Sequence, residues 1–443
     1  MFGAFITGFI IIILTFLAGV LGLFGWLIFP PVSLSFFINY EKRPAQFVKK
    51  LVGKIRVSSK APVKVLLDNE AGKFVLVHAG VALNELVDNA KEKLEIPSDV
   101  PFKSYSDLLG YLVKENVWSK EFFQKKAIQA DDLILAASTW DKKGEKDTLN
   151  KKFFGRPGIG LELLFGYTPN LNQYSLDLST PQPFSHRLIG REQVVSRMER
   201  ALSQGNSVML VGEPGVGKRT VTLEFAQRAS YGLLGRNLSF MRVLEFDYNF
   251  LLSEAIDLNQ KKSKLSLILK EAAAAGNIIL VIRDMQRLTN SEVEGIDFTD
   301  LFEEHLEKGE LKIISVSTLA DYERFIARNT RLKKYMDVVE IKPPSLDESL
   351  LILNQAAYRW EQLKGVVVTI SALRAILQGS DRYITDIPFP EKAIELLDSC
   401  VVYSEGKGLK TITSQEVNEI LSEKVGVPFP HLTEKEKIRL TNL

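Results

Sequence analysis

The sequence predicts an α/β protein whose parallel sheet is covered by helices on both faces. From about residue 188, short apolar runs alternate with helical patterns, a glycine-rich loop follows the first run, and a mainly helical stretch follows the last. Such alternation is typical of a parallel sheet. The apolar runs are SVMLV at 207–211, RVLEF at 242–246, IILVI at 278–282, LKIISVS at 311–317 and VVEI at 338–341.

Composition limits the class of protein. The chain has 443 residues, which leaves room for about three domains of roughly 150 residues each. Charged residues make up 25% and hydrophobic residues 46%, which excludes wholesale disorder and a many-span transporter. A net charge of +2 predicts no nucleic-acid partner. The single cysteine, Cys400, excludes an intramolecular disulfide.

The first 40 residues contain no charged side chain, and residues 4–29 are almost wholly apolar. At about 1.5 Å per residue, this segment is long enough as a helix to cross the roughly 30 Å hydrocarbon core. It predicts one transmembrane helix rather than a cleaved signal peptide, because no basic residue precedes it. Seven basic residues follow between positions 42 and 60, so the positive-inside rule places the remaining domains in the cytoplasm.

The pattern of periodic and broken segments predicts the domain boundaries. Residues 152–187 are rich in glycine and proline and interrupt every period, which is typical of a linker. Ser345 and Glu348 have the spacing of a capping box that opens a helix. The predicted parts are a membrane anchor with an interfacial segment at 1–40, a helical domain at 41–151, the linker at 152–187, an α/β subdomain at 188–344, a helical lid at 345–425 and a terminal junction at 426–443.

The glycine-rich loop has the sequence GEPGVGKRT and lies between the first predicted strand and a helix. Its glycines allow backbone N–H groups to converge on a phosphate at the helix N-terminus, and Lys218 is placed to reach the phosphate oxygens. We therefore predict a nucleotide-binding loop. Its residues are Gly212, Glu213, Pro214, Gly215, Val216, Gly217, Lys218, Arg219 and Thr220.

From about residue 166 onward the chain resembles the first ATPase module of the Clp AAA+ unfoldase chaperones. The resemblance is carried by YTPNLNQYSLDLS, LIGREQVVSRMERAL, GEPGVGK, GELKIISVSTLADYERFIA and SDRYITDIPFPEKAIELLDS. VPFPHLTEKEKIRLTNL resembles the junction to a second module, and residues 104–140 resemble half of the helical Clp N-terminal domain. The resemblance implies an AAA+ P-loop sheet with a helical lid, an oligomeric ring, ATP or ADP bound between subunits, and protein substrates or adaptors.

The positions that hold Mg²⁺ in the family carry different residues here. Arg219 occupies the position of the hydroxyl ligand, and Thr220 follows one residue late. In the ungapped register, Arg283 replaces the family's metal-binding Asp, and Asp284 replaces its catalytic Glu; a shifted register would make Asp284 the metal ligand. We therefore predict no metal site and hypothesise nucleotide binding that does not require Mg²⁺, the alternative being an empty pocket.

Two further family positions are altered. Lys334 and Tyr335 occupy the positions of the paired arginine fingers, and lysine lacks the planar fork of arginine. The position of the substrate-gripping tyrosine of the pore loop falls near Asp257, followed by Leu258 and Asn259. Both changes predict weak activation between subunits and weak threading of substrates.

Other family positions are kept. Ser317 and Thr318 fall near the position that senses the γ-phosphate, and Thr318 is the predicted sensor. Ile189, Gly190 and Arg191, in the segment LIGRE, fall near the adenine pocket. The histidines share no spacing typical of metal ligands: they are His78, His186, His305 and His431.

These observations favour a membrane-tethered Clp-like subunit that binds adenine nucleotide and acts in protein remodelling or quality control as a scaffold or regulator. Because the altered positions all lower the expected rate, we predict little or no hydrolysis by this chain alone. Two alternatives remain open: a ring subunit that hydrolyses ATP and unfolds proteins, and a nucleotide-free adaptor that binds partners through its helical domain.

Overall fold

The computed structural model describes residues 44–57, 62–91, 96, 102–126, 128–149, 168–180, 188–254 and 257–425. The chain divides into two compact units, with the boundary between Lys151 and Lys152. Among the described residues, no helix is long and apolar enough to cross a membrane. The segment 4–29 predicted to span the bilayer and the junction predicted at 426–443 both lie outside the described residues.

The N-terminal unit is helical, as the sequence predicts for this region. Leu108, Leu109 and Leu112 lie on one helix and are buried. Tyr105 is buried beside them, and its hydroxyl donates to the Leu66 carbonyl at 2.8 Å. The helices are α3 (Pro44–Val57), α4 (Pro62–Leu67), α5 (Glu70–Ala79), α6 (Leu83–Asp88), α7 (Tyr105–Lys114), α8 (Lys120–Lys125) and α9 (Ala130–Leu149).

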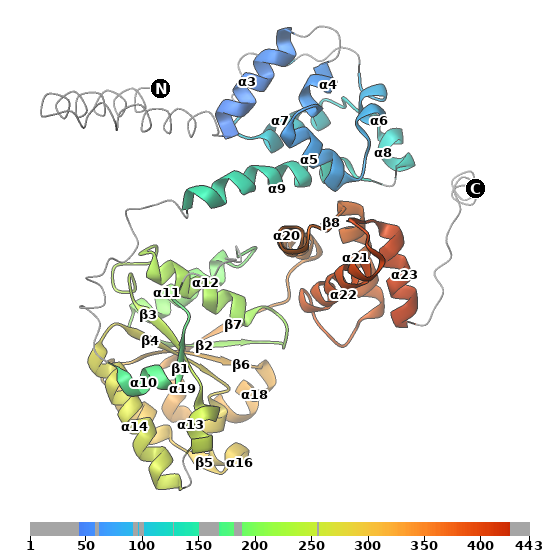
Figure 1. The fold of residues 1–443 in the computed structure, drawn as a ribbon. Coiled ribbons are helices and arrows are strands. Elements are labelled where there is room, and N and C mark those ends of the chain that lie inside the picture. The colour runs from blue at the N-terminus through green and yellow to red at the C-terminus, as the bar shows by residue number, and fades with distance from the viewer. Residues whose placement is uncertain are drawn as a thin grey trace, which may run out of the picture. The chain divides into compact units, whose positions relative to one another are not determined.

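A six-stranded sheet forms the centre of the second unit (Figure 1). All five strands predicted from apolar runs are present and pair in parallel. Every residue of β2 is buried, because this strand has a neighbour on each side and helices on both faces. In spatial order the strands are β1 (Ser175–Asp177), β3 (Arg242–Phe246), β4 (Ile278–Arg283), β6 (Lys312–Ser317), β2 (Ser207–Gly212) and β7 (Met336–Ile341).

Helices cover both faces of this sheet (Figure 1). α11 (Glu192–Ser203) and α12 (Lys218–Ser230) pack on one face, while α14 (Leu258–Ala275) and α17 (Thr299–Glu307) pack on the other. The two apolar layers keep the strand ends fixed, and the phosphate loop lies at one of those ends. The remaining elements are α10 (Pro169–Gln173), α13 (Tyr248–Glu254), α15 (Gln286–Thr289), α16 (Ser291–Glu294), β5 (Ile296–Asp297), α18 (Leu319–Asp321), the π-helix η2 (Tyr322–Ile326) and α19 (Thr330–Lys333).

The structure corrects part of the linker predicted at 152–187. Residues 169–173 form α10, and β1 pairs antiparallel with β3, so the sheet is mixed rather than wholly parallel. Glu271 on α14 accepts the backbone N–H groups of Asn170 and Leu171 at 3.1 and 3.0 Å, and Arg242 forms an ion pair with Asp177 at 3.2 Å. These contacts with distant residues hold a segment whose local sequence resembles a loop.

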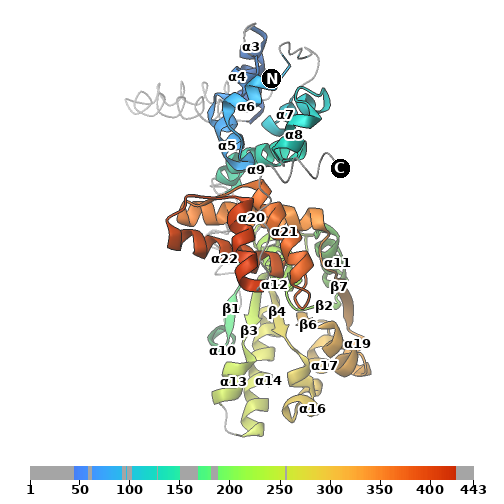
Figure 2. The same ribbon diagram turned by 90° about the vertical axis from the view of Figure 1, so that its right-hand side faces the viewer.

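Four helices and a two-stranded ribbon form the lid, and α20, α21 and α22 lie side by side in Figure 2. The predicted capping box is present: Ser345 caps the Glu348 backbone, and the Glu348 side chain returns to the Ser345 N–H. Cys400 is fully buried in this bundle. The elements are α20 (Leu346–Lys364), β8 (Val367–Val368), α21 (Ile370–Tyr383), α22 (Glu391–Lys407), β9 (Thr411–Ile412) and α23 (Ser414–Val425).

Candidate functional site

The glycine-rich loop joins the end of β2 to the start of α12, as the sequence predicts. Gly215 and Gly217 adopt left-handed backbone conformations, with φ of 79° and 97°. Residues with a Cβ rarely adopt these angles, so the two glycines let the loop turn sharply before the helix. The first N–H groups of α12 have no partner within the helix, which makes this end of the helix suited to a phosphate.

Lys218 lies at the base of the loop. Its Nζ donates to the carbonyl oxygens of Gly212 and Glu213 at 2.8 and 2.7 Å. Burial lowers the pKa of Lys218, and the carboxylates of Asp284, Glu391 and Glu213 act in the opposite direction. The ammonium group of Lys218 therefore lies among carbonyl and carboxylate oxygens. A phosphate chain carries more negative charge, so the ammonium group can move to bind it.

The two residues at the end of β4 have different environments. Arg283 forms an ion pair with Glu245 on the neighbouring strand β3. Asp284 has a left-handed backbone, with φ of 49°, and its N–H donates to the Val316 carbonyl at 2.8 Å. Asp284 is the first of the carboxylates that act on Lys218, so it is the acidic group at β4 that faces the phosphate loop. Arg283, in contrast, already has a carboxylate partner.

Neither residue at the hydroxyl-ligand position has the geometry that Mg²⁺ requires. Arg219 is exposed, and Thr220 faces a cavity on the lid side of α12. Thr220 comes one residue after the hydroxyl-ligand position. On a helix, one residue turns the side chain by about 100°, so Thr220 points in a different direction from a residue at that position. The guanidinium groups of Arg219 and Arg283 offer Mg²⁺ no oxygen ligand, whereas in the shifted register Asp284, which faces the phosphate loop, would be a metal ligand.

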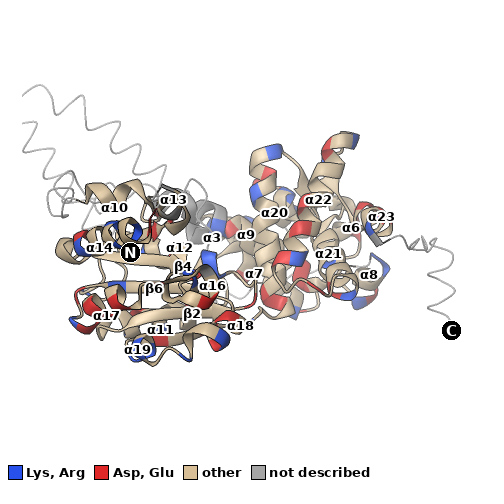
Figure 3. Ribbon diagram, turned by 90° about the horizontal axis from the view of Figure 1, so that it is seen from below, with Lys and Arg blue, Asp and Glu red and all other residues tan. Residues whose placement is uncertain are grey.

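Thr318 lies at the same edge of the sheet as the phosphate loop, because β6 runs between β2 and β4, whereas Lys334 precedes β7 at the opposite edge. Thr318 follows β6, donates to Asp321 Oδ2 at 2.7 Å and caps α18. Lys334 forms an ion pair with Glu303 at 3.2 Å. Acidic residues of α17 lie beside basic residues of α19 in Figure 3, and Arg331 joins Glu303 and Asp300 there. The roles of Thr318 and Lys334 in catalysis stay predictions.

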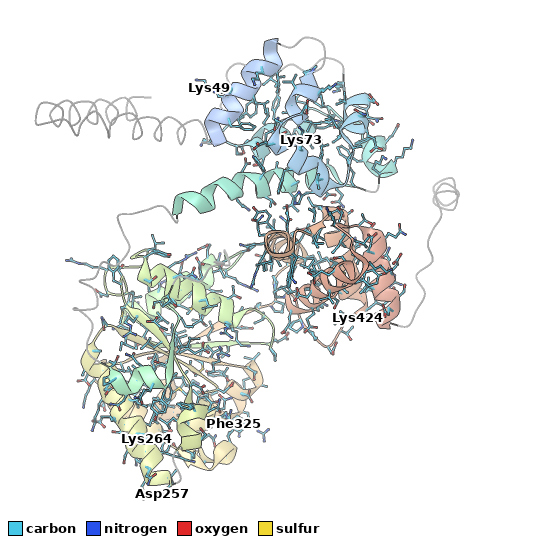
Figure 4. The ribbon with its side chains drawn as sticks, viewed as in Figure 1. Lys49, Lys73, Asp257, Lys264, Phe325 and Lys424 are labelled. Atoms are coloured by element: carbon cyan, nitrogen blue, oxygen red, sulfur yellow. The ribbon has the colours of Figure 1, made fainter. Side chains whose placement is uncertain are left out.

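The pore-loop position lies at the far end of α14. Figure 4 shows Asp257 at this tip, with Lys264 further along the helix. Asp257 directly precedes α14, and the neighbouring Leu258 is half exposed. The described part of this segment thus places a carboxylate and an aliphatic side chain at the position where the family has an aromatic one.

A cavity of about 350 Å³ lies between the α/β core and the lid. Its size is within the range of small-molecule sites, and its wall is mostly apolar with a few polar groups. Trp360 on α20 donates its Nε1 hydrogen to Asp398 on α22 at 2.7 Å, which joins two lid helices at the cavity wall. The lining residues are Leu188, Ile189, Arg191, Val216, Gly217, Thr220, Val221, Ile352, Gln355, Ala356, Arg359, Trp360, Leu363, Pro390, Ile394 and Asp398.

Arg191 lines this cavity and has an unsatisfied donor. Its Nη2 atom is buried and has no hydrogen-bond partner within the described part of the chain. Burial lowers the pKa of Arg191, and the Glu348 carboxylate opposes this shift. A buried donor without a partner costs about 1–3 kcal/mol, so an acceptor atom on a ligand would be favoured here.

The structure brings several predicted residues together and adds others. Ile189, Val216, Gly217 and Thr220 line one cavity, next to Lys218. Gly190 has φ of 69°, and a Cβ there would lie 2.1 Å from Glu348, so this glycine permits close contact with the lid. Arg191 was expected near the adenine pocket, whereas Trp360, Asp398 and Glu391 were not among the predicted site residues. Their sequence signal is weak, because the site forms only when two subdomains distant in sequence pack together.

Comparisons with known proteins agree with this arrangement. A family model described as an AAA lid domain matches residues 345–425. The chain is 31% identical over 287 residues to the chaperone protein ClpB of Oceanobacillus iheyensis, covering 62% of this chain and 35% of the relative. It is 32% identical over 349 residues to the chaperone protein ClpB of Wolinella succinogenes, covering 72% of this chain and 40% of the relative.

A solved structure shows the same fold. The Saccharomyces cerevisiae Hsp104–ADP complex matches with a TM-score of 0.54 and 23% identity, covering 61% of this chain and 48% of that one. The chain thus spans less than half of the length of these relatives. The sequence matches support homology to the Clp-family AAA+ chaperones, and the structural match supports an AAA+ α/β fold with a helical lid.

Proposed function

We propose that this chain is a membrane-tethered, Clp-like AAA+ subunit that binds adenine nucleotide and acts as a scaffold or regulator in protein remodelling or quality control. The observation that carries nucleotide binding is the combination of a phosphate loop with an adjoining apolar cavity. Arg191 lines that cavity, and its Nη2 atom is buried without a hydrogen-bond partner among the described residues. The homology to ClpB and the ADP complex of the matched Hsp104 structure favour adenine nucleotide as the ligand.

Each part of the site has a separate task in this proposal. The backbone N–H groups of the loop and the Nζ of Lys218 bind the phosphate chain. The apolar wall, with Ile189 and Val216, excludes water from the base. Arg191 donates to an acceptor atom of the nucleotide. Together these contacts hold the ligand between core and lid, so that binding stabilises one arrangement of the two subdomains.

The same geometry supports weak or absent hydrolysis. Arg283 is paired with Glu245, and Arg219 is exposed. Lys334, at the family's arginine-finger position, is paired with Glu303 in the same chain. An arginine finger is worth about 10³–10⁵ in rate. We therefore assign the chain a binding and regulatory role rather than that of an independent motor.

The location and partners follow from the sequence and the homology. The tether rests on the apolar segment 4–29, and the cytoplasmic orientation rests on the basic residues at 42–60. Ring formation with further copies or with related subunits, and contacts with protein substrates or adaptors, rest on the resemblance to the Clp family. In this arrangement a nucleotide-binding ring is held at the cytoplasmic face of a membrane.

Nucleotide titration of the purified full chain in detergent tests this proposal. Wild-type protein should bind ADP and ATP, and Lys218→Ala should weaken binding at least tenfold because a charge-assisted phosphate contact is lost. Lys262→Ala, at an exposed position on α14, is the matched control and should bind normally. Absence of binding by the wild type would favour the nucleotide-free adaptor. Phosphate release above the blank that Lys218→Ala abolishes would favour the active ATPase.

A further inference from the structure

Glu391 is the first residue of α22 in the lid, and its carboxylate lies against the phosphate loop. A Cβ placed on Gly215 would lie 1.8 Å from Glu391 Oε2. Gly215 also has a φ of 79°, which residues with a Cβ rarely adopt. The short distance to Glu391 and the left-handed backbone therefore both exclude a larger residue at this position. The carboxylate of the lid therefore contacts the backbone of the loop that is suited to bind phosphate.

Glu391 also acts on the cation of the loop. It is one of three carboxylates, with Asp284 and Glu213, whose charge opposes the effect of burial on the pKa of Lys218. Lys218 is thus not the only charged group that a phosphate chain would meet. A ligand that enters the loop gains attraction from Lys218 and repulsion from the carboxylates around it.

A divalent cation would normally reduce this repulsion. Here the two family positions for its ligands carry Arg219 and Arg283, and Arg283 is already paired with Glu245. The balance between attraction by Lys218 and repulsion by the carboxylates therefore depends on the charge that the nucleotide itself carries. Free ATP carries about one negative charge more than free ADP at neutral pH, because the terminal phosphate has its second pKa near 6–7 in both.

We propose that Glu391 is a specificity-determining residue that makes the phosphate loop favour nucleotides of lower negative charge, the diphosphate over the triphosphate. The inference rests on the proposed function, because it concerns the same nucleotide site. It differs from a structural role for Glu391, since a structural contact would affect both nucleotides equally. Charge repulsion, in contrast, increases with each charge that the ligand carries.

The test is a comparison of ATP and ADP affinities of the full chain in detergent, in EDTA and at low ionic strength. Glu391→Gln removes the charge and keeps the shape. We expect it to strengthen ATP binding about tenfold and ADP binding about threefold, so that the ratio of the two dissociation constants changes about threefold. Glu391→Ala should change the ratio in the same direction, and Glu391→Asp should retain the wild-type ratio.

Glu395→Gln is the matched control, because Glu395 lies one turn further along α22 and is exposed. It should leave both affinities unchanged. An unchanged ratio in Glu391→Gln and Glu391→Ala, or weaker binding of both nucleotides, overturns the inference while the proposed function stands. If the wild-type chain binds neither nucleotide, the proposed function fails and the inference fails with it. Thermal unfolding midpoints of the variants show that each one is folded.

Discussion

Arg191→Met should weaken ligand binding without lowering the stability of the free protein. The substitution keeps an apolar stem in the cavity wall and removes the guanidinium group, whose Nη2 is buried without a partner. In the free protein this removes an unsatisfied donor. In the nucleotide complex it removes a hydrogen bond that the proposal assigns to Arg191. An ordinary structural arginine would give the opposite result for stability, because its loss would leave partners unpaired.

The expected changes in the dissociation constant and in the unfolding free energy follow from the free energy of each contact. A hydrogen bond from a charged donor contributes about 1.5–3 kcal/mol, which corresponds to about 10- to 150-fold in the dissociation constant. Arg191 is only partly buried, so we expect a value near the lower limit, about tenfold weaker binding. Without nucleotide, the unfolding free energy should stay equal or rise by up to about 1 kcal/mol, because relief of the unsatisfied donor is partly offset by lost attraction to Glu348.

Isothermal titration with ADP and urea unfolding without ADP measure the two effects. Arg197→Met is the control on the same helix: its Nη2 donates to the Val338 carbonyl at 3.1 Å on the exposed surface. This variant should bind ADP as the wild type does. The reasoning is refuted if Arg191→Met binds ADP within threefold of the wild type, or if it loses more than about 1 kcal/mol of stability without nucleotide.

Three further predictions concern the groups around the site. Glu245→Ala and Arg283→Ala in a double-mutant cycle should give a coupling energy of about 0.5–1 kcal/mol in urea unfolding, since the pair is partly exposed; a coupling near zero would contradict the assigned ion pair. Trp360→Phe should lower the unfolding free energy by about 1.5–3 kcal/mol through loss of the bond to Asp398, and an unchanged value would contradict that bond. Burial raises the pKa of the Cys400 thiol to about 12, so it should react with a thiol reagent only after unfolding; rapid modification of the native chain near pH 8 would contradict this.

The central strands could be predicted from sequence because each one carries its own signal. An apolar run such as 278–282 is buried on both faces and needs no distant partner to be recognised. β1 is different, since its three residues have the burial pattern of a loop and are held by Arg242 and by the docking of α10 on Glu271. These contacts join residues more than 60 positions apart. Local periodicity contains no information about them.

The candidate site could also be predicted only in part from local sequence patterns. The loop at Gly212–Thr220 is contiguous, so its glycines and Lys218 could be named from their spacing. The cavity wall comes from the core and from two lid helices, and Trp360 was not singled out from the sequence. The pairing of Arg283 with Glu245 also required the strand register. Sequence patterns therefore located the phosphate loop, whereas the charges around it became apparent only in three dimensions.

The most direct test of the central claim is an equilibrium titration of ADP into the full chain with excess Mg²⁺ and again with EDTA. The account predicts saturable binding in both buffers, with dissociation constants within about threefold of each other, because Lys218, the loop and Arg191 supply the contacts without a metal. Tight binding in Mg²⁺ together with no binding in EDTA would contradict it.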